Sequence, residues 1–102
     1  MDTFQHISIE QVQQLLAANA EAKVVDIRDP ASYQAGHIPG SQAINDDTLG
    51  AFLSQANKTR ALVVCCYHGN SSQNAADFFV EQGFEDVYSL DGGYAAWAAQ
   101  DQ

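Results

Sequence analysis

The sequence predicts an α/β fold, a single domain with an open parallel sheet and helices on both faces. Short runs rich in β-branched residues alternate with stretches of helical periodicity from one end of the chain to the other. The run at 61–66 is apolar throughout, which is typical of a strand covered by helices on both sides. A length of 102 residues leaves room for one domain, so we expect residues 1–102 to form it.

Capping and apolar spacing predict the first elements. After an extended piece at 4–7, Ser8 with Gln11 three residues later indicates a capping box, which begins a helix that runs through residue 20. One face of this helix is apolar, with Ile9, Val12, Leu15 and Leu16. Residues 23–27 are predicted to form a buried strand, and residues 42–44 a brief one.

Two short helices are predicted before the run at 61–66. Asp29 supplies an N-cap and Pro30 a first helical residue for a helix that stops at Gly36. Asp46 or Asp47 is expected to cap the next helix, which extends to about residue 57. The remaining elements are a helix at 71–82 closed by Gly83, a strand at 87–90, the turn Asp91-Gly92-Gly93 and a last helix from Tyr94.

Charge and hydropathy exclude several classes of partner. Thirteen acidic and four basic residues give a net charge of −9, so we expect neither nucleic acid nor a membrane surface as partner, because both recruit basic patches. No apolar run is long enough to cross a bilayer, and the first residues lack a signal-peptide pattern, so we expect a cytoplasmic location. The cysteine and histidine spacing fits no zinc site, and we expect neither metal nor cofactor.

The loop that begins at Cys66 carries the candidate chemistry. Ligands of open α/β sheets bind beyond the carboxyl ends of the strands, which is where Cys66 lies. A loop of small and polar residues that curls into a helix can aim several backbone N–H groups at the sulfur. Such a ring of donors binds anions and favours the thiolate, the nucleophilic form of cysteine. The residues expected to bind substrate are Tyr67, His68, Gly69, Asn70, Ser71 and Ser72.

The two adjacent cysteines have different expected roles. Cys66 could be a small buried hydrophobic residue, but its place between a strand and a helix favours the nucleophile. Successive residues of a strand face opposite sides of the sheet, so Cys65 is expected to enter the packed layer away from the loop. In a reducing cytoplasm neither cysteine is expected to form part of a disulfide framework.

Three motifs in order resemble the rhodanese family of sulfurtransferases, and the resemblance covers nearly the whole chain. Residues 25–30, followed by Tyr33 and by residues 36–41, are similar to the N-terminal signature of the family. Residues 90–97 are similar to its C-terminal signature, and the loop of Cys66 lies between the two. The length and the uncharged loop resemble the short single-domain members.

The resemblance implies a double-displacement mechanism. The Cys66 thiolate would take the outer sulfur of thiosulfate, release sulfite and pass its persulfide sulfur to cyanide or to a dithiol protein such as thioredoxin. Many members carry Arg or Lys in the loop, whereas residues 67–72 hold neither. Donor binding would then depend on backbone N–H groups, the helix dipole and the hydroxyls of Ser71 and Ser72.

Two other functions remain as alternatives. Phosphatases and arsenate reductases also place a cysteine loop before a helix, but they use a Cys-x5-Arg pattern, and the matching position here is Ser72. A persulfide carrier or binding module that uses another sulfur donor is the second alternative. A silent binding module usually lacks the cysteine, and Cys66 is present.

Other residues of the motifs receive mostly structural roles. Arg28 could reach a substrate, but its spacing from Asp26 favours an internal salt bridge that holds the turn. His37 is expected to be a buried hydrogen-bonding residue rather than a base, and Trp97 to anchor the core from the last helix. His68 could line the pocket, although its backbone N–H could be its whole contribution.

Overall fold

Five parallel strands form one sheet in the order β1-β5-β4-β2-β3 in the computed structural model, which describes residues 4–100. The strands are β1 (Gln5–Ile7), β2 (Lys23–Asp26), β3 (Gln42–Ala43), β4 (Leu62–Cys65) and β5 (Val87–Leu90). The helices are α1 (Ile9–Ala18), α2 (Pro30–Ala35), α3 (Leu49–Gln55), α4 (Ser71–Glu81) and α5 (Gly93–Ala99). Strand β4 lies at the centre, between β2 and β5, and the predicted open parallel sheet is confirmed.

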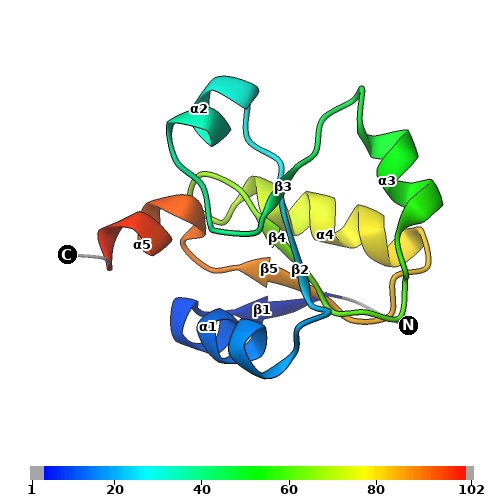
Figure 1. Cartoon of the computed structure of the whole chain (residues 1–102), viewed down its shortest axis with the longest axis horizontal. Helices are drawn as coiled ribbons and strands as arrows, with labels where there is room; N and C mark the ends of the chain where they lie inside the picture. The colour runs from blue at the N-terminus through cyan, green and yellow to red at the C-terminus, as the bar shows by residue number, and fades with distance from the viewer. Residues whose placement is uncertain (1–3, 101–102) are drawn as a thin grey trace.

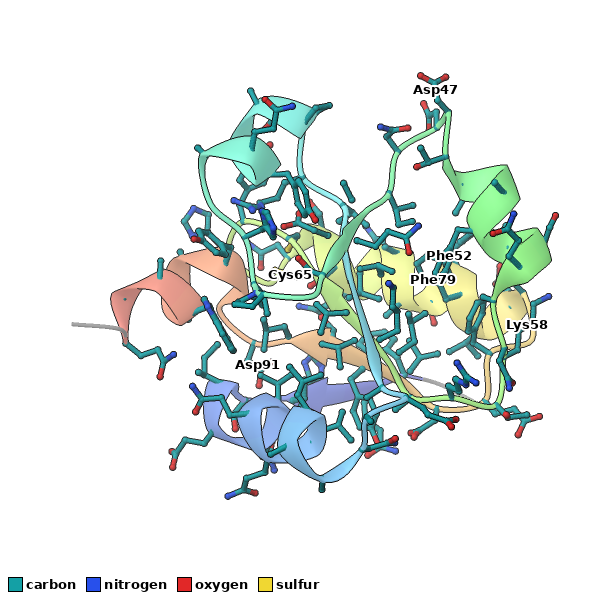
Figure 2. The ribbon with its side chains drawn as sticks, viewed as in Figure 1. Asp47, Phe52, Lys58, Cys65, Phe79 and Asp91 are labelled. Atoms are coloured by element: carbon teal, nitrogen blue, oxygen red, sulfur yellow. The ribbon has the colours of Figure 1, made fainter. Side chains whose placement is uncertain are left out.

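Helices cover both faces of the sheet, as the sequence predicts. Val63 packs with residues of α1 and α5, whereas its neighbour Val64 packs with residues of α3 and α4, because strand side chains alternate between the faces. Figure 1 shows α1 and α4 on opposite sides of the strands. Phe52 and Phe79 meet edge to face between α3 and α4, with ring centroids 5.9 Å apart (Figure 2). Trp97 packs on the opposite core cluster, which confirms its predicted anchoring role.

The predicted caps of the first two helices are confirmed. Ser8 and Gln11 form both reciprocal hydrogen bonds of the capping box at the start of α1. Asp29 caps α2 by accepting a backbone N–H of the first turn at 3.0 Å. Helix α1 ends before the predicted residue 20, because the side chain of Asn19 accepts the N–H of Glu21 and starts a turn.

The predicted cap of α3 is wrong. Neither Asp46 nor Asp47 occupies the N-cap position of this helix, which belongs to Thr48. The side chain of Asn45 accepts the N–H groups of Asp47 and Thr48, at 2.8 and 3.1 Å. This turn satisfies two backbone N–H groups that precede the helix, and the aspartates remain in solvent. Figure 2 shows Asp47 at the tip of the loop before α3.

The remaining element ends lie within two residues of the predicted ones. The longest helix of the described part of the chain is α4, with 11 residues. A membrane-spanning helix needs about 20 apolar residues. None of the helices within residues 4–100 has the length and apolar character that such a span requires.

A buried ion pair joins the end of β2 to α2 and α5. Arg28 donates to the carboxylate of Asp26 through Nε and Nη2, at 2.8 to 3.1 Å, and both side chains are buried. Nη2 also donates to the carbonyl of Gly36 at 2.7 Å, and the guanidinium lies 4.2 Å from the ring centroid of Tyr94. The hydrogen bond to Asp26 raises the pKa of Arg28, so the guanidinium stays charged. The predicted internal salt bridge is confirmed.

We expect Arg28→Leu to lower the free energy of unfolding by about 3 to 5 kcal/mol, because it leaves the Asp26 carboxylate buried without its partner. Arg60→Leu is the matched control, since Arg60 pairs with Glu21 at an exposed position, where such a pair contributes about 0 to 1 kcal/mol. Urea unfolding measures both variants. Equal and small losses would show that the buried pair does not hold the turn.

Candidate active site

The loop after β4 surrounds the sulfur of Cys66 with hydrogen-bond donors. Cys66 follows the last residue of β4, and α4 begins at Ser71. The backbone N–H of Gly69 donates to the Cys66 Sγ at 3.1 Å. The N–H groups of His68 and Ser72 and the hydroxyl of Ser72 are the other donors that lower the pKa of this thiol. We call these donors of His68, Gly69 and Ser72 the donor cradle.

Two opposing effects set the pKa of Cys66. Burial raises the pKa, because it takes the thiolate out of water. The hydroxyl and N–H of Ser72 and the N–H groups of Gly69 and His68 lower the pKa, and together they outweigh burial. The pKa of Cys66 therefore lies below its ordinary value, which favours the nucleophilic thiolate.

Cys65 lies on the other face of the sheet, as predicted. Its side chain is fully buried among the residues that pack against α1 and α5. Burial, reinforced by the negative charge of Asp26, raises the pKa of Cys65 to about 12, so this thiol stays protonated at neutral pH. Both cysteines are free thiols with opposite tendencies to ionise.

The start of α5 fixes the orientation of the loop. The N–H of Tyr94 donates to the carbonyl of Cys66 at 2.8 Å, and the N–H of Ala95 donates to the carbonyl of Tyr67 at 3.0 Å. In a trans peptide the carbonyl and the N–H point in opposite directions. Because the Tyr67 carbonyl points to α5, the N–H of His68 in the same peptide points away from α5, toward the sulfur. Figure 1 shows α5 beginning beside this loop.

Two glycines permit the close approach of the loop and the turn before α5. A Cβ at Gly93, where φ is 60°, would lie 2.4 Å from the carbonyl oxygen of Cys66. A Cβ at Gly69, where φ is 93°, would lie 2.8 Å from the backbone nitrogen of Gly92. Both backbones are in the left-handed region that glycine adopts without strain. The two glycines thus allow the backbones of the loop and of the Asp91-Gly92-Gly93 turn to pack against each other.

The side chain of Tyr67 leaves the donor cradle and contacts α2. Its hydroxyl donates to the carboxylate of Asp29, the N-cap of α2, and accepts the N–H of Asp29 at 3.2 Å. This hydrogen bond, with those from Ser32, holds the pKa of Asp29 well below its usual range. Tyr67 therefore links the loop to the start of α2 by hydrogen bonds.

The structure brings only some of the predicted loop residues to the sulfur. His68, Gly69 and Ser72 supply the donor cradle, and His68 does so through its backbone, because its side chain is exposed. The exposed side chains of the loop also include those of Tyr67, Asn70 and Ser71. Sequence reasoning missed Ser89 of β5, whose Oγ lies 2.7 Å from Ser72 Oγ. Strand alternation could have placed Ser89 on the α4 face, but not opposite Ser72.

The expectation that His37 is buried is wrong, although its hydrogen bond is present. His37 is exposed, and its Nδ1 donates to the carbonyl of Tyr33 at 2.8 Å. The two rings stack with centroids 3.9 Å apart, so one face of the imidazole is covered while the other meets solvent. Within residues 4–100, no group of three or more His, Cys, Asp or Glu side chains is arranged to hold a metal ion.

Comparison with known proteins gives relatives that cover nearly the whole chain. The Rhodanese-like domain family matches residues 8–100. The thiosulfate sulfurtransferase GlpE of Pseudoalteromonas translucida is 52% identical over 96 residues, which are 94% of this chain and 90% of the relative. The protein of the same name from Pseudomonas aeruginosa is 55% identical over 96 residues, 94% of this chain and 86% of the relative. A solved rhodanese-like domain from Anabaena matches with a TM-score of 0.84 and 27% identity, over 99% of this chain and 76% of that chain.

We expect the alkylation of Cys66 to show a midpoint below the ordinary thiol pKa of about 8.5, because the donor cradle stabilises the thiolate. The rate of reaction with iodoacetamide is measured against pH on Cys65→Ser, which leaves one thiol in the chain. The rate should fall as the pH drops through the midpoint, because protonation removes the thiolate. A midpoint at or above the ordinary value would show that burial outweighs the hydrogen bonds.

Gly93→Ala should raise that midpoint by about half a unit to one unit, the equivalent of one lost hydrogen bond. The new Cβ pushes α5 away from the carbonyl of Cys66, and the loop then loses its orientation. Gly50→Ala is the matched control, because a Cβ at Gly50 meets no atom within 4 Å. The two variants are compared in the Cys65→Ser background. An unchanged midpoint in Gly93→Ala would contradict the role of α5.

Proposed function

The chain belongs to the Rhodanese-like domain family, and from that premise we propose that Cys66 is the nucleophile of its sulfur transfer. Relatives that are 52% and 55% identical are named thiosulfate sulfurtransferase, and this chain has the same enzymatic activity. The observation that supports Cys66 is the donor cradle, which lowers the pKa of this thiol, whereas Cys65 is held protonated on the other face of the sheet.

The first half-reaction is a displacement at sulfur. The electron pair of the Cys66 thiolate forms a bond to the outer sulfur of thiosulfate. The S–S bond of thiosulfate breaks, and its electron pair leaves with sulfite. The product is a Cys66 persulfide anion, and no proton enters or leaves. A general base is therefore unnecessary when the thiolate is already formed, which fits a cradle without a histidine side chain.

Residues 67–72 form the proposed binding site for the donor and for the transferred sulfur. This segment contains no Lys or Arg, and the nearby guanidinium of Arg28 is engaged by Asp26 and by the carbonyl of Gly36. Backbone N–H groups and the start of α4 are thus the positive dipoles available to the anion. Ser72 stands where Cys-x5-Arg enzymes need an arginine, and it is fully buried, which separates this site from a phosphatase.

The second half-reaction passes the outer sulfur to an acceptor. Cyanide attacks that sulfur, thiocyanate leaves and the Cys66 thiolate is restored. A thioredoxin-like dithiol is the proposed protein acceptor. Its first thiolate takes the sulfur, and its second thiol then forms a disulfide and releases hydrosulfide. The cycle needs Cys66 as a free thiol and the dithiol acceptor in its reduced form, so we place the protein in the cytoplasm.

Incubation with thiosulfate should add one sulfur atom to the wild-type protein and to Cys65→Ser, and none to Cys66→Ser. Intact mass detects the adduct, and cyanide or reduced thioredoxin should remove it. In steady-state assays Cys66→Ser should retain less than about a thousandth of the activity, as expected for loss of a nucleophile. Cys65→Ser should retain most of it.

Three outcomes of this experiment would contradict the proposal in different ways. An adduct on Cys66→Ser would show that another residue is the nucleophile. An adduct that forms only with a persulfide protein, and not with thiosulfate, would identify a carrier with another donor. An adduct that cyanide removes and reduced thioredoxin does not would leave the sulfur transfer intact and exclude the dithiol acceptor.

A further inference from the structure

Two buried hydroxyls lie next to Cys66 where α4 packs on β5. Ser72 and Ser89 are both 0% exposed, and their Oγ atoms are 2.7 Å apart. Ser89 pairs with Val64 in the sheet, and Val64 faces the same side as Cys66 two residues later. Ser89 is therefore on the face of the sheet that carries the donor cradle, although it belongs to neither the loop nor α4.

The direction of the hydrogen bond between Ser72 and Ser89 determines whether the Ser72 hydroxyl can donate to the sulfur. A hydroxyl has one proton to donate and can accept two hydrogen bonds, whereas a thiolate has no proton to donate. If Ser72 gives its proton to Ser89, the sulfur loses a donor. If Ser89 gives its proton to Ser72, the proton of Ser72 is free to point to the Cys66 Sγ. Only the second arrangement lets the Ser72 hydroxyl add its proton to the N–H donors at the thiolate, and it forms the chain Ser89 to Ser72 to Cys66.

We propose that Ser89 is a positioning residue that holds the hydroxyl of Ser72 as a donor to the Cys66 sulfur. The inference rests on the proposed role of Cys66 in sulfur transfer. Ser89 touches neither substrate nor sulfur in this arrangement and acts through Ser72 alone. Serial hydrogen bonds in a buried environment also polarise one another, which strengthens the last bond in the chain.

The two half-reactions respond differently to a donor at Sγ. In persulfide formation, negative charge leaves Sγ for the outer sulfur, so a donor at Sγ gives the transition state no advantage over the thiolate. In persulfide discharge, Sγ is the leaving group, and its charge returns as the bond to the outer sulfur breaks. A donor aimed at Sγ stabilises that developing charge. Ser89 should therefore favour discharge and not formation.

The test is a single-turnover comparison of Ser89→Ala with the wild type. Each protein is loaded with thiosulfate, freed of excess donor and mixed with cyanide, and the loss of the sulfur adduct is followed by mass. We expect discharge to slow by about three- to tenfold, the effect of one neutral hydrogen bond. Formation, measured at a pH above the alkylation midpoint, should change by less than about twofold, and the alkylation midpoint should rise by about half a unit.

Two further variants make the test specific. Ser41→Ala is the matched control, because Ser41 is also buried and its hydroxyl has no hydrogen-bond partner within the described residues. It should change neither rate nor midpoint. In the double variant of Ser72→Ala and Ser89→Ala, the loss in discharge should equal that of Ser72→Ala alone, because Ser89 acts through Ser72.

Additive losses in the double variant would overturn the proposal. Equal slowing of both half-reactions in Ser89→Ala with an unchanged midpoint would also overturn it, because that is the pattern of a general structural defect. Failure of the proposed function gives a different result. If Cys66 carried no persulfide, the wild type would form no adduct or would form one that Cys66→Ser also forms. Alkylation requires no sulfur transfer, so the midpoint shift in Ser89→Ala would still report on the hydroxyl chain.

Discussion

The hydrogen bonds from the start of α5 to the carbonyls of Cys66 and Tyr67 are the constraint on which the site depends. They orient the peptide planes of the loop, and the planes aim the N–H groups at the sulfur. They require the close approach at Gly93, and they require that α5 be held in place. Trp97 packs α5 onto the core, and the ring of Tyr94 lies against the guanidinium of Arg28. Segments distant in sequence therefore converge on a single loop.

The electrostatics of the site follow from the same constraint. The chain carries a net charge of −9, and the loop offers no cationic side chain to an approaching anion. A set of N–H dipoles fixed by the fold needs no rearrangement when charge moves, which is the condition for electrostatic preorganisation. The buried guanidinium of Arg28 is not available to bind the anion, because it donates hydrogen bonds to Asp26 and to the Gly36 carbonyl. Its contribution is mechanical: it holds the end of β2 against α2 and α5.

Local patterns predicted the features that depend on local geometry. The alternation of strands and helices, the capping box of Ser8, the cap by Asp29 and the opposite faces of Cys65 and Cys66 all follow from short-range rules. The errors arose where several local solutions compete. Asp46 or Asp47 was expected to cap α3, but Asn45 forms a turn before the helix and the N-cap position belongs to Thr48. The partner of Ser72 could not be predicted, because the contact with Ser89 is set by how α4 packs on β5.

The separation of the two cysteines bears on the fate of a persulfide at Cys66. A vicinal thiolate on the same face could attack the persulfide, form a disulfide and release hydrosulfide before any acceptor arrived. Cys65 is fully buried on the opposite face of the sheet, and the pKa of about 12 leaves it protonated and a poor nucleophile. Strand alternation thus keeps the thiol of Cys65 away from the sulfur of Cys66, although the two residues are adjacent in the sequence. In the proposed mechanism, the transferred sulfur then leaves Cys66 through an acceptor that reaches the loop from outside.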